Sequence, residues 1–140
     1  GSTVGIALGD SKTDNLVDYA ILDCPMSEGE FMIETALKDM EIGIPINYLL
    51  FTGNIVTKIK LGFTFEDTVV ANHIKNSNTP ILIFNSRVDD VTPYFMGEEL
   101  YNSIDHENKE LITYENSKHT NLYPDDPDKY TASVLEFLGK

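Results

Sequence analysis

Short runs of apolar residues at three places along the chain predict three β-strands. Residues 80–85 form a continuous apolar run behind a proline, which is typical of a parallel strand covered on both faces. Residues 17–23 and 110–114 are short and rich in β-branched and aromatic side chains, a composition that favours strands over helices. The pattern therefore predicts three buried strands separated by long connections.

The stretch before the first strand is made of small residues. Residues 2–11 are small and apolar and contain Gly5 and Gly9, so we predict a short helix packed closely against the sheet. Residues 10–15 are polar and predict the loop that leads into the strand.

The long connection between the first two strands has the pattern of helices. Ser27 and Glu30 have the spacing of a capping box, which predicts the start of an amphipathic helix. The apolar stretch 46–61 predicts a second helix, broken near Thr52 and Gly53. Further helices are predicted at residues 67–75, 94–104 and 128–138.

Strands and helices alternate along the chain, which predicts right-handed crossovers and a mostly parallel sheet. We expect an α/β fold class, a partial three-layer α/β/α arrangement in a single domain over residues 1–140. Residues 27–76 are expected to form a helical insertion in this domain. In such sheets chemistry takes place beyond the carboxyl ends of the strands, so the residues after each strand are the first candidates for a site.

Composition excludes several classes of function. The 41% hydrophobic fraction is too high for a disordered acidic chain and predicts a packed core. The net charge of −13 argues against binding to nucleic acid or to an anionic membrane surface. Cys24 is the single cysteine, and no H-x-x-x-H spacing occurs, so we expect no disulfide, no metal and no cofactor. No apolar stretch is long enough to span a bilayer.

Two polar loops follow neighbouring strands. Asp89 and Asp90 come after the run 80–85, and His119 comes after the run 110–114, thirty residues beyond Asp89. That gap is one strand–helix–strand step, which predicts that the two loops are neighbours. An Asp bonded to a His orients the imidazole as a general base. The simpler alternatives are that either Asp caps the next helix and that the His is merely solvated.

Other residues have weaker claims to chemistry. Cys24 follows the first strand and is interpreted as a small buried hydrophobic residue, although a nucleophile beside His119 is conceivable. His73 is expected in helix packing or on the surface, and His106 in a turn.

The segment that carries Asp89 resembles the acid loop of α/β-hydrolases, a proline-led strand followed by an Asp four residues before a Pro. The acid position of the family matches Asp89. Residues 109–121 resemble the family's next segment, a strand and the loop with the catalytic histidine, and that position matches His119. The order of Asp before His agrees as well.

The resemblance extends from residue 16 to residue 140 and implies the C-terminal half of the hydrolase fold, with 27–76 as a helical cap. The strand end at 21–26 resembles the one that precedes the family's cap. Two departures are clear. Asn85-Ser86 replaces the frequent His-Gly at the acid loop, and no G-x-S-x-G nucleophile elbow is present.

Three interpretations of the first residues remain. Thr3 stands at the nucleophile position of a degenerate elbow, or Gly1 is the last glycine of an elbow whose Ser precedes the chain, or Gly1-Ser2 is a cloning remnant. The second interpretation is preferred because residues 1–8 resemble the small-residue helix that follows the nucleophile in the family.

The resemblance implies a serine hydrolase that attacks an ester, thioester or amide carbonyl through a Ser-His-Asp triad, in which Asp89 and His119 are the catalytic residues of this chain. Expected partners are a small-molecule acyl substrate or a short peptide, in the cytoplasm. The alternative is a non-catalytic binding or assembly module with half of the fold. The strand from Val17 to Leu22 is expected to expose an edge that pairs with a second copy or with an N-terminal fragment.

Overall fold

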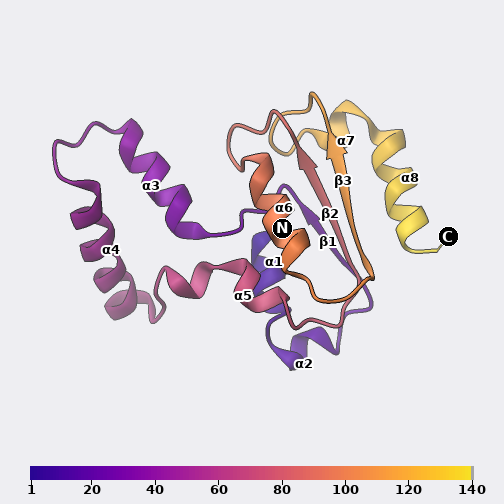
Figure 1. Ribbon diagram of the computed structural model, residues 1–140, viewed down its shortest axis with the longest axis horizontal. Helices are drawn as coiled ribbons and strands as arrows, with labels where there is room; N and C mark the ends of the chain where they lie inside the picture. The colour runs from indigo at the N-terminus through magenta and orange to yellow at the C-terminus, as the bar shows by residue number, and fades with distance from the viewer. Residues whose placement is uncertain (140) are drawn as a thin grey trace. The chain divides into compact units, whose positions relative to one another are not determined.

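A computed structural model describes residues 1–139 and contains a three-stranded sheet with all strands parallel (Figure 1). The strands are β1 (Ala20–Asp23), β2 (Ile81–Ser86) and β3 (Lys109–Tyr114), in the order β1-β2-β3. The chain forms two compact units, described separately below. The sheet unit combines Gly1–Ser27 with the chain from Val70 onward, and the helical unit is Glu28–Val69.

Strand β2 occupies the centre of the sheet, and all six of its residues are buried. This burial explains why its sequence is continuously apolar. Strand β1 is shorter than predicted, because pairing with β2 begins only at Ala20, opposite Ile81. Pro80 precedes that position and has no N–H to donate, so the ladder cannot extend backward through it.

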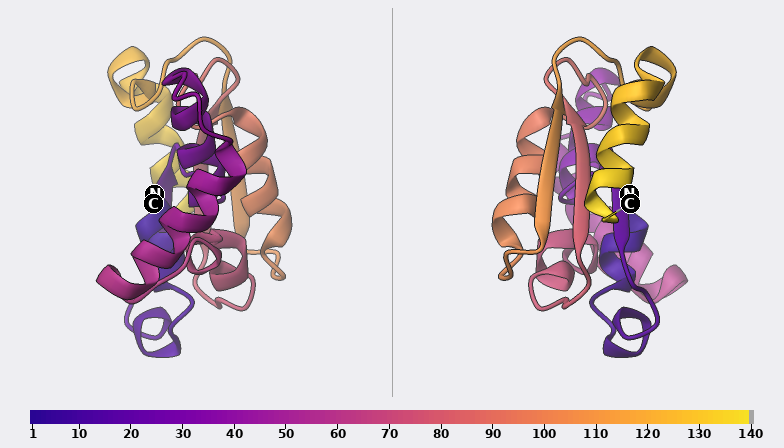
Figure 2. Two further views of the ribbon diagram at one scale, coloured as in Figure 1. Left: turned by 90° about the vertical axis from the view of Figure 1, so that its left-hand side faces the viewer. Right: turned by 90° about the vertical axis from the view of Figure 1, so that its right-hand side faces the viewer.

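Helices cover both faces of this sheet, as the α/β prediction requires. One face packs against α1 (Ser2–Ala7), α5 (Val70–Ile74) and α6 (Tyr94–Ser103), and the other against α7 (Leu122–Asp125) and α8 (Pro127–Phe137). Figure 2 shows α6 and α8 on opposite sides of the strands. The predicted strands and the helices 94–104 and 128–138 are confirmed, whereas α7 was not predicted.

Close packing of α1 depends on glycine, as predicted. The element nearest to Gly5 is helix α5, whereas the sheet was expected. A Cβ on Gly5 would lie 2.6 Å from Val70 Cγ1 and 3.1 Å from Ile74 Cγ2, both in α5. The polar stretch 10–15 was predicted as a loop, and this is wrong in part. It contains a short helix, α2 (Ser11–Asp14), whose first turn is capped by the Asp10 side chain.

The helical unit contains α3 (Gly29–Asp39), α4 (Ile46–Leu61) and the 3₁₀ turn η1 (Glu66–Thr68). The predicted break in α4 is wrong, because the helix is continuous through Gly53 and the Thr52 hydroxyl bonds back to the Tyr48 carbonyl. Across the described residues, no helix combines the length and apolar character needed to cross a membrane.

The predicted capping role of Ser27 is also wrong. Glu28 occupies the N-cap position of α3 and makes no side-chain cap bond, while the Ser27 hydroxyl donates to Glu99 Oε2 at 2.7 Å. Helix α5 packs into the core of the sheet unit, and the compact helical unit ends at Val69, while the cap insertion over 27–76 stays a prediction.

Candidate active site

The acid loop follows the carboxyl end of β2 and is held by backbone hydrogen bonds. Asp89 Oδ1 accepts the N–H groups of Val91 at 2.9 Å and Thr92 at 2.8 Å. Burial by itself raises the pKa of Asp89, but hydrogen bonds from His119, Thr92 and Val91 outweigh it and hold the pKa below its ordinary value. Asp89 is therefore an ionised carboxylate at neutral pH, although its side chain is fully enclosed.

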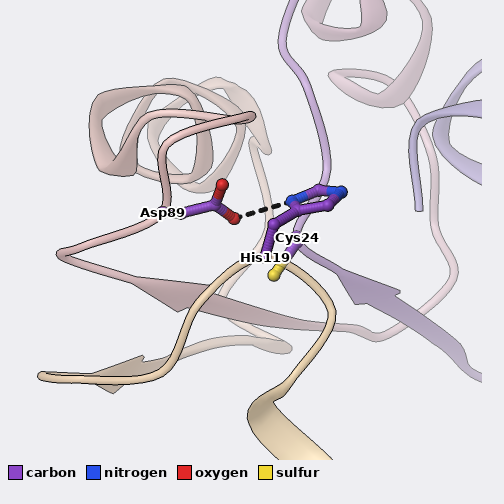
Figure 3. A group of neighbouring side chains, drawn as sticks. All are labelled: Cys24, Asp89 and His119. Carbon is purple, nitrogen blue, oxygen red and sulfur yellow. Dashed lines mark hydrogen bonds and ion pairs between the residues drawn. The ribbon is translucent and has the colours of Figure 1, made fainter.

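His119 lies on the loop after β3 and meets Asp89 directly. Its Nδ1 atom is 2.8 Å from Asp89 Oδ2 (Figure 3). An ionised carboxylate only accepts hydrogen bonds, so Nδ1 carries the hydrogen in this contact and Nε2 holds the free electron pair of the neutral ring. The His119 side chain is 26% exposed, and among residues 1–139 no group bonds to Nε2. This pair therefore presents a free ring nitrogen to solvent.

Parallel pairing of β2 and β3 brings the two loops together. Ser86 at the end of β2 lies opposite Tyr114 at the end of β3. Beyond that point the Arg87 N–H donates to the Tyr114 carbonyl at 2.9 Å, and Arg87 Nε lies 3.3 Å from Glu115 Oε1. The loops therefore start side by side. This is why Asp89 and His119, thirty residues apart in the sequence, come within hydrogen-bond distance.

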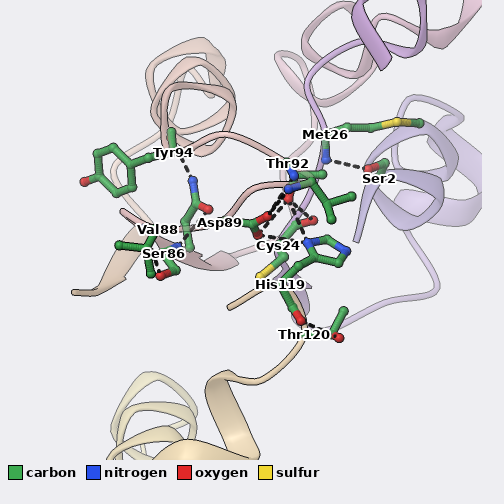
Figure 4. A network of polar contacts seen from close by, with 12 residues as sticks. Ser2, Cys24, Met26, Ser86, Val88, Asp89, Thr92, Tyr94, His119 and Thr120 are labelled. Atoms are coloured by element: carbon green, nitrogen blue, oxygen red, sulfur yellow. Dashed lines mark hydrogen bonds and ion pairs between the residues drawn. The ribbon is translucent and has the colours of Figure 1, made fainter. Parts of the chain in front are cut away.

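Thr92 is part of the same network and was not singled out from the sequence (Figure 4). Its Oγ1 lies 2.9 Å from Asp89 Oδ2, 3.1 Å from His119 Nδ1 and 3.2 Å from the Cys24 carbonyl oxygen. The hydroxyl thus links the ends of β1 and β2 to the histidine loop. The only sequence signal was its place between Asp89 and Pro93.

Cys24 also reaches this edge, from the end of β1. It is buried and adopts a left-handed backbone conformation with φ +43°, and Thr120, next to His119, does the same with φ +60°. Burial raises the pKa of the Cys24 thiol strongly, and the carboxylates of Asp23 and Asp89 raise it further against the opposing Thr120 N–H. The protonated thiol is a poor nucleophile, which favours the interpretation of Cys24 as a buried residue.

The amino end of α1 lies beside the carboxyl end of β1. The Met26 N–H donates to Ser2 Oγ at 2.8 Å, and a Cβ on Gly1 would lie 3.0 Å from both the Asp23 carbonyl oxygen and Pro25 Cβ. The first residues of the chain therefore reach the same edge of the sheet as Cys24. Thr3 lies within α1, and its side chain makes no hydrogen bond to any described residue.

The remaining candidates lie elsewhere. Asp90 is exposed, and α6 has Pro93 at its N-cap, so neither predicted capping role at that helix is observed. His73 is in α5 and contacts Gly9, and His106 is in the turn that leads into β3, at the opposite end of that strand from His119.

Comparison with known proteins shows the fold. No family model and no curated protein sequence matches the chain. The Pyrococcus furiosus esterase Pf2001 superposes with a TM-score of 0.64 and 19% identity, over 99% of this chain and 49% of the esterase. The α/β-hydrolase enzyme MGS-M2 from a Medee basin deep-sea metagenome gives 0.60 and 18%, over 99% and 62%. The Paleococcus ferrophilus monoacylglycerol lipase gives 0.58 and 14%, over 96% and 64%.

The chain thus resembles part of an α/β-hydrolase, and it spans about half to two thirds of these proteins. The observed sheet, its parallel strands and the helices on both faces agree with that fold. At identities of 14–19% the similarity shows the fold alone, and any reaction has to be argued from the residues of the site.

Proposed function

We propose that this chain supplies the acid and the histidine of a serine hydrolase with the α/β-hydrolase fold. The observation that carries the proposal is the 2.8 Å hydrogen bond from His119 Nδ1 to the enclosed Asp89, which leaves Nε2 accessible. This is the geometry a general base needs: one ring nitrogen oriented by a carboxylate and the other free to accept a proton.

In this mechanism Asp89 stays ionised and orients the ring, while His119 Nε2 takes the proton of a serine hydroxyl. The serine oxygen forms a bond to the substrate carbonyl carbon, and the resulting imidazolium is stabilised by Asp89. His119 then returns its proton to the leaving alcohol, thiol or amine as that bond breaks. Water repeats the sequence on the acyl-enzyme, releasing the acid and restoring the serine.

The nucleophile in this proposal is a serine that precedes Gly1 in the intact protein. Two observations support this position. The start of α1 packs against residues Asp23 and Pro25 at the carboxyl end of β1. The similar solved structures are also longer than this chain. In the hydrolase fold the nucleophile occupies the sharp turn between a strand and the helix that follows it, and α1 is the helix expected to follow that turn.

The helical unit Glu28–Val69 is proposed as the cap. It leaves the sheet unit within a few residues of the β1 end, where Cys24 joins the site. Apolar side chains are abundant on its helices and remain well exposed, including Tyr48, Phe51 and Ile59. An apolar cap suits acyl esters, thioesters or amides, or short peptides, as substrates.

A second candidate function is a non-catalytic module that assembles through the sheet edge. Strand β1 is at the edge of the three-stranded sheet, and among residues 1–139 its one partner strand is β2. Such an edge offers unpaired backbone groups to another strand, from a second copy or an N-terminal fragment. This candidate predicts association of the chain measured by light scattering and no hydrolysis with or without the residues encoded before Gly1.

Hydrolysis of p-nitrophenyl esters of increasing acyl length, by a protein that carries this chain together with the residues encoded before Gly1, tests the proposal. We expect ester hydrolysis and labelling of one serine by a fluorophosphonate probe. His119→Gln is expected to lower kcat by about 10⁴-fold, and Asp90→Asn, at the exposed neighbour of the acid, is the matched control. Absence of a reactive serine, or full activity in His119→Gln, overturns the proposal.

A further inference from the structure

The end of β1 adds a thiol to the Asp89–His119 pair. One atom from each of Cys24, Asp89 and His119, a sulfur, a carboxylate oxygen and a ring nitrogen, lies within 4.8 Å of the other two (Figure 3). Among residues 1–139 this is the one group of three such ligand-bearing side chains at that spacing. The residues come from three separate segments of the sheet edge, so the juxtaposition is a product of the tertiary fold.

We propose that Cys24, Asp89 and His119 bind a zinc-type divalent cation, with the fourth coordination position open to water. Thiolate, imidazole and carboxylate together form a donor set for zinc or cobalt, and the sulfur disfavours magnesium and calcium, which prefer oxygen. Three protein ligands and one open position describe an accessible zinc site. This proposal departs from the sequence expectation of no metal, which rested on the single cysteine and on the absence of an H-x-x-x-H spacing.

The observed spacing is close to what coordination needs. Tetrahedral zinc with bonds near 2.1–2.3 Å places its ligand atoms about 3.5 Å apart, so the group must contract by roughly 1 Å. The Asp89–His119 contact is shorter than that, at 2.8 Å, so these two ligand atoms must separate by roughly 0.7 Å while the Cys24 sulfur moves closer to both. The partly exposed side of His119 provides the approach from solvent.

Backbone conformation supports a specific role for the thiol. Cys24 and Thr120 are two of the three non-glycine residues with positive φ in the described chain. Such conformations are unfavourable for residues with a Cβ and persist where surrounding structure imposes them, often at functional sites. Here Cys24 is one of the three ligands and Thr120 directly follows another, His119, and the Thr120 N–H faces the Cys24 sulfur.

Binding exchanges the thiol proton for the metal. The S–H bond of Cys24 breaks, a sulfur–metal bond forms, and the proton passes to the buffer. The negative charge of Asp89, which lies within 4.8 Å of the sulfur, favours a bound cation. At His119 the hydrogen that Nδ1 donates to Asp89 moves to Nε2 as Nδ1 coordinates the metal, so the thiol proton is the one released.

A bound metal would also stop His119 from acting as a general base, because a coordinated imidazole cannot take up and return a proton. This consequence rests on the proposed function, whereas metal binding does not. Zinc is therefore expected to inhibit ester hydrolysis with the same midpoint concentration at which it binds.

Cobalt titration tests the site directly. Because Cys24 is the single cysteine, any thiolate-to-cobalt charge-transfer absorption reports this residue. We expect one Co²⁺ per chain with such a band, displaced by Zn²⁺. Cys24→Ser should abolish the band and weaken Zn²⁺ binding by at least about 100-fold, His119→Gln should weaken binding similarly, and Asp90→Asn should change neither. Near-UV circular dichroism checks that each variant is folded.

Saturating Co²⁺ without a charge-transfer band, or unchanged Zn²⁺ affinity in both the Cys24 and His119 variants, overturns the inference. The two variants keep the test decisive if one of them does not fold. The readout is independent of hydrolysis: a metal-binding chain without a reactive serine keeps the inference and removes the proposed function, and an active hydrolase without cobalt binding does the reverse.

Discussion

Two buried aspartates at opposite ends of the sheet have similar surroundings and different partners. Asp89 lies beyond the carboxyl end of β2 with 6% of its surface exposed, and Asp14 lies beside the residues that enter β2, with 7% exposed. Burial raises the pKa of both carboxyls, and hydrogen bonds lower both pKa values below the ordinary value. Burial and a lowered pKa therefore do not distinguish a catalytic carboxylate from a structural one.

The partners make the distinction. Asp14 accepts from the Ser77 hydroxyl, the Asn78 N–H at 3.0 Å, and the Thr79 hydroxyl at 2.7 Å, and none of these partners is titratable. Asp89 divides its oxygens between backbone N–H groups and His119, which has a further nitrogen open to solvent. Asp14 holds a loop in place through hydrogen bonds, whereas Asp89 can act on a substrate indirectly, by orienting the His119 ring.

Of the changes that test this contrast, Asp89→Asn is expected to have the largest effect, and the effect is on hydrolysis. The amide can still accept from Val91 and Thr92, but its NH₂ group cannot accept the Nδ1 hydrogen, and as a donor it stabilises the wrong tautomer of His119. We expect kcat to fall by about 10³–10⁴-fold, while the free energy of unfolding changes by less than about 1 kcal/mol. Steady-state kinetics and urea unfolding measure the two quantities. A loss of stability matching that of Asp14→Asn would erase the contrast.

Asp14→Asn is expected to show the opposite pattern. An amide can replace only part of the acceptor capacity that Ser77 and Thr79 use, and it brings two donors into a cluster of donors. We expect the free energy of unfolding to fall by about 2–3 kcal/mol, with kcat per folded molecule unchanged. Urea unfolding with active-site titration checks both. A selective loss of kcat in a stable variant would contradict the structural role.

Acid pH should reduce the difference between wild type and Asp14→Asn. The folded-state pKa of Asp14 lies below its unfolded value, so its stabilising contribution is complete above the unfolded pKa of about 3.9 and is lost as pH falls toward the folded value. We expect the two unfolding curves to approach each other below about pH 4 and to stay apart between pH 5 and 8. A constant difference down to pH 2 would assign the stabilisation to something other than the charge.

Thr92→Val is expected to have the smallest effect. It removes the hydroxyl that touches Asp89 and His119 but keeps the shape of the side chain. As a positioning residue, Thr92 should contribute about 1 kcal/mol, a 5–10-fold decrease in kcat with little change in KM. Thr92→Ser should restore activity and the pH profile of kcat. A uniform loss in both variants, accompanied by lower stability, would indicate a packing role alone.

Much of the fold is encoded locally in this chain. The apolar run in β2 predicts a strand covered on both faces. Alternate side chains of a strand point to opposite faces of the sheet, and helices cover both faces here. The thirty-residue spacing of Asp89 and His119 places them on neighbouring loops, because parallel strands end at one edge. The N-terminal boundary of β1 and the uninterrupted α4 were not predictable in this way. They depend on where Pro80 meets the neighbouring strand and on the helical hydrogen bonding around Thr52.

Local patterns were enough to predict the three strands, most of the helices and the neighbouring acid and histidine loops, because apolar periodicity and the alternation of strands with helices are visible along the chain. The polar partners, in contrast, followed from the packing of distant segments. Ser27 bonds to Glu99 instead of capping α3, Thr92 joins the histidine, and Cys24 meets Asp89. A hydrogen bond between distant segments depends on packing that brings donor and acceptor within 3 Å or so, and no local pattern specifies that distance.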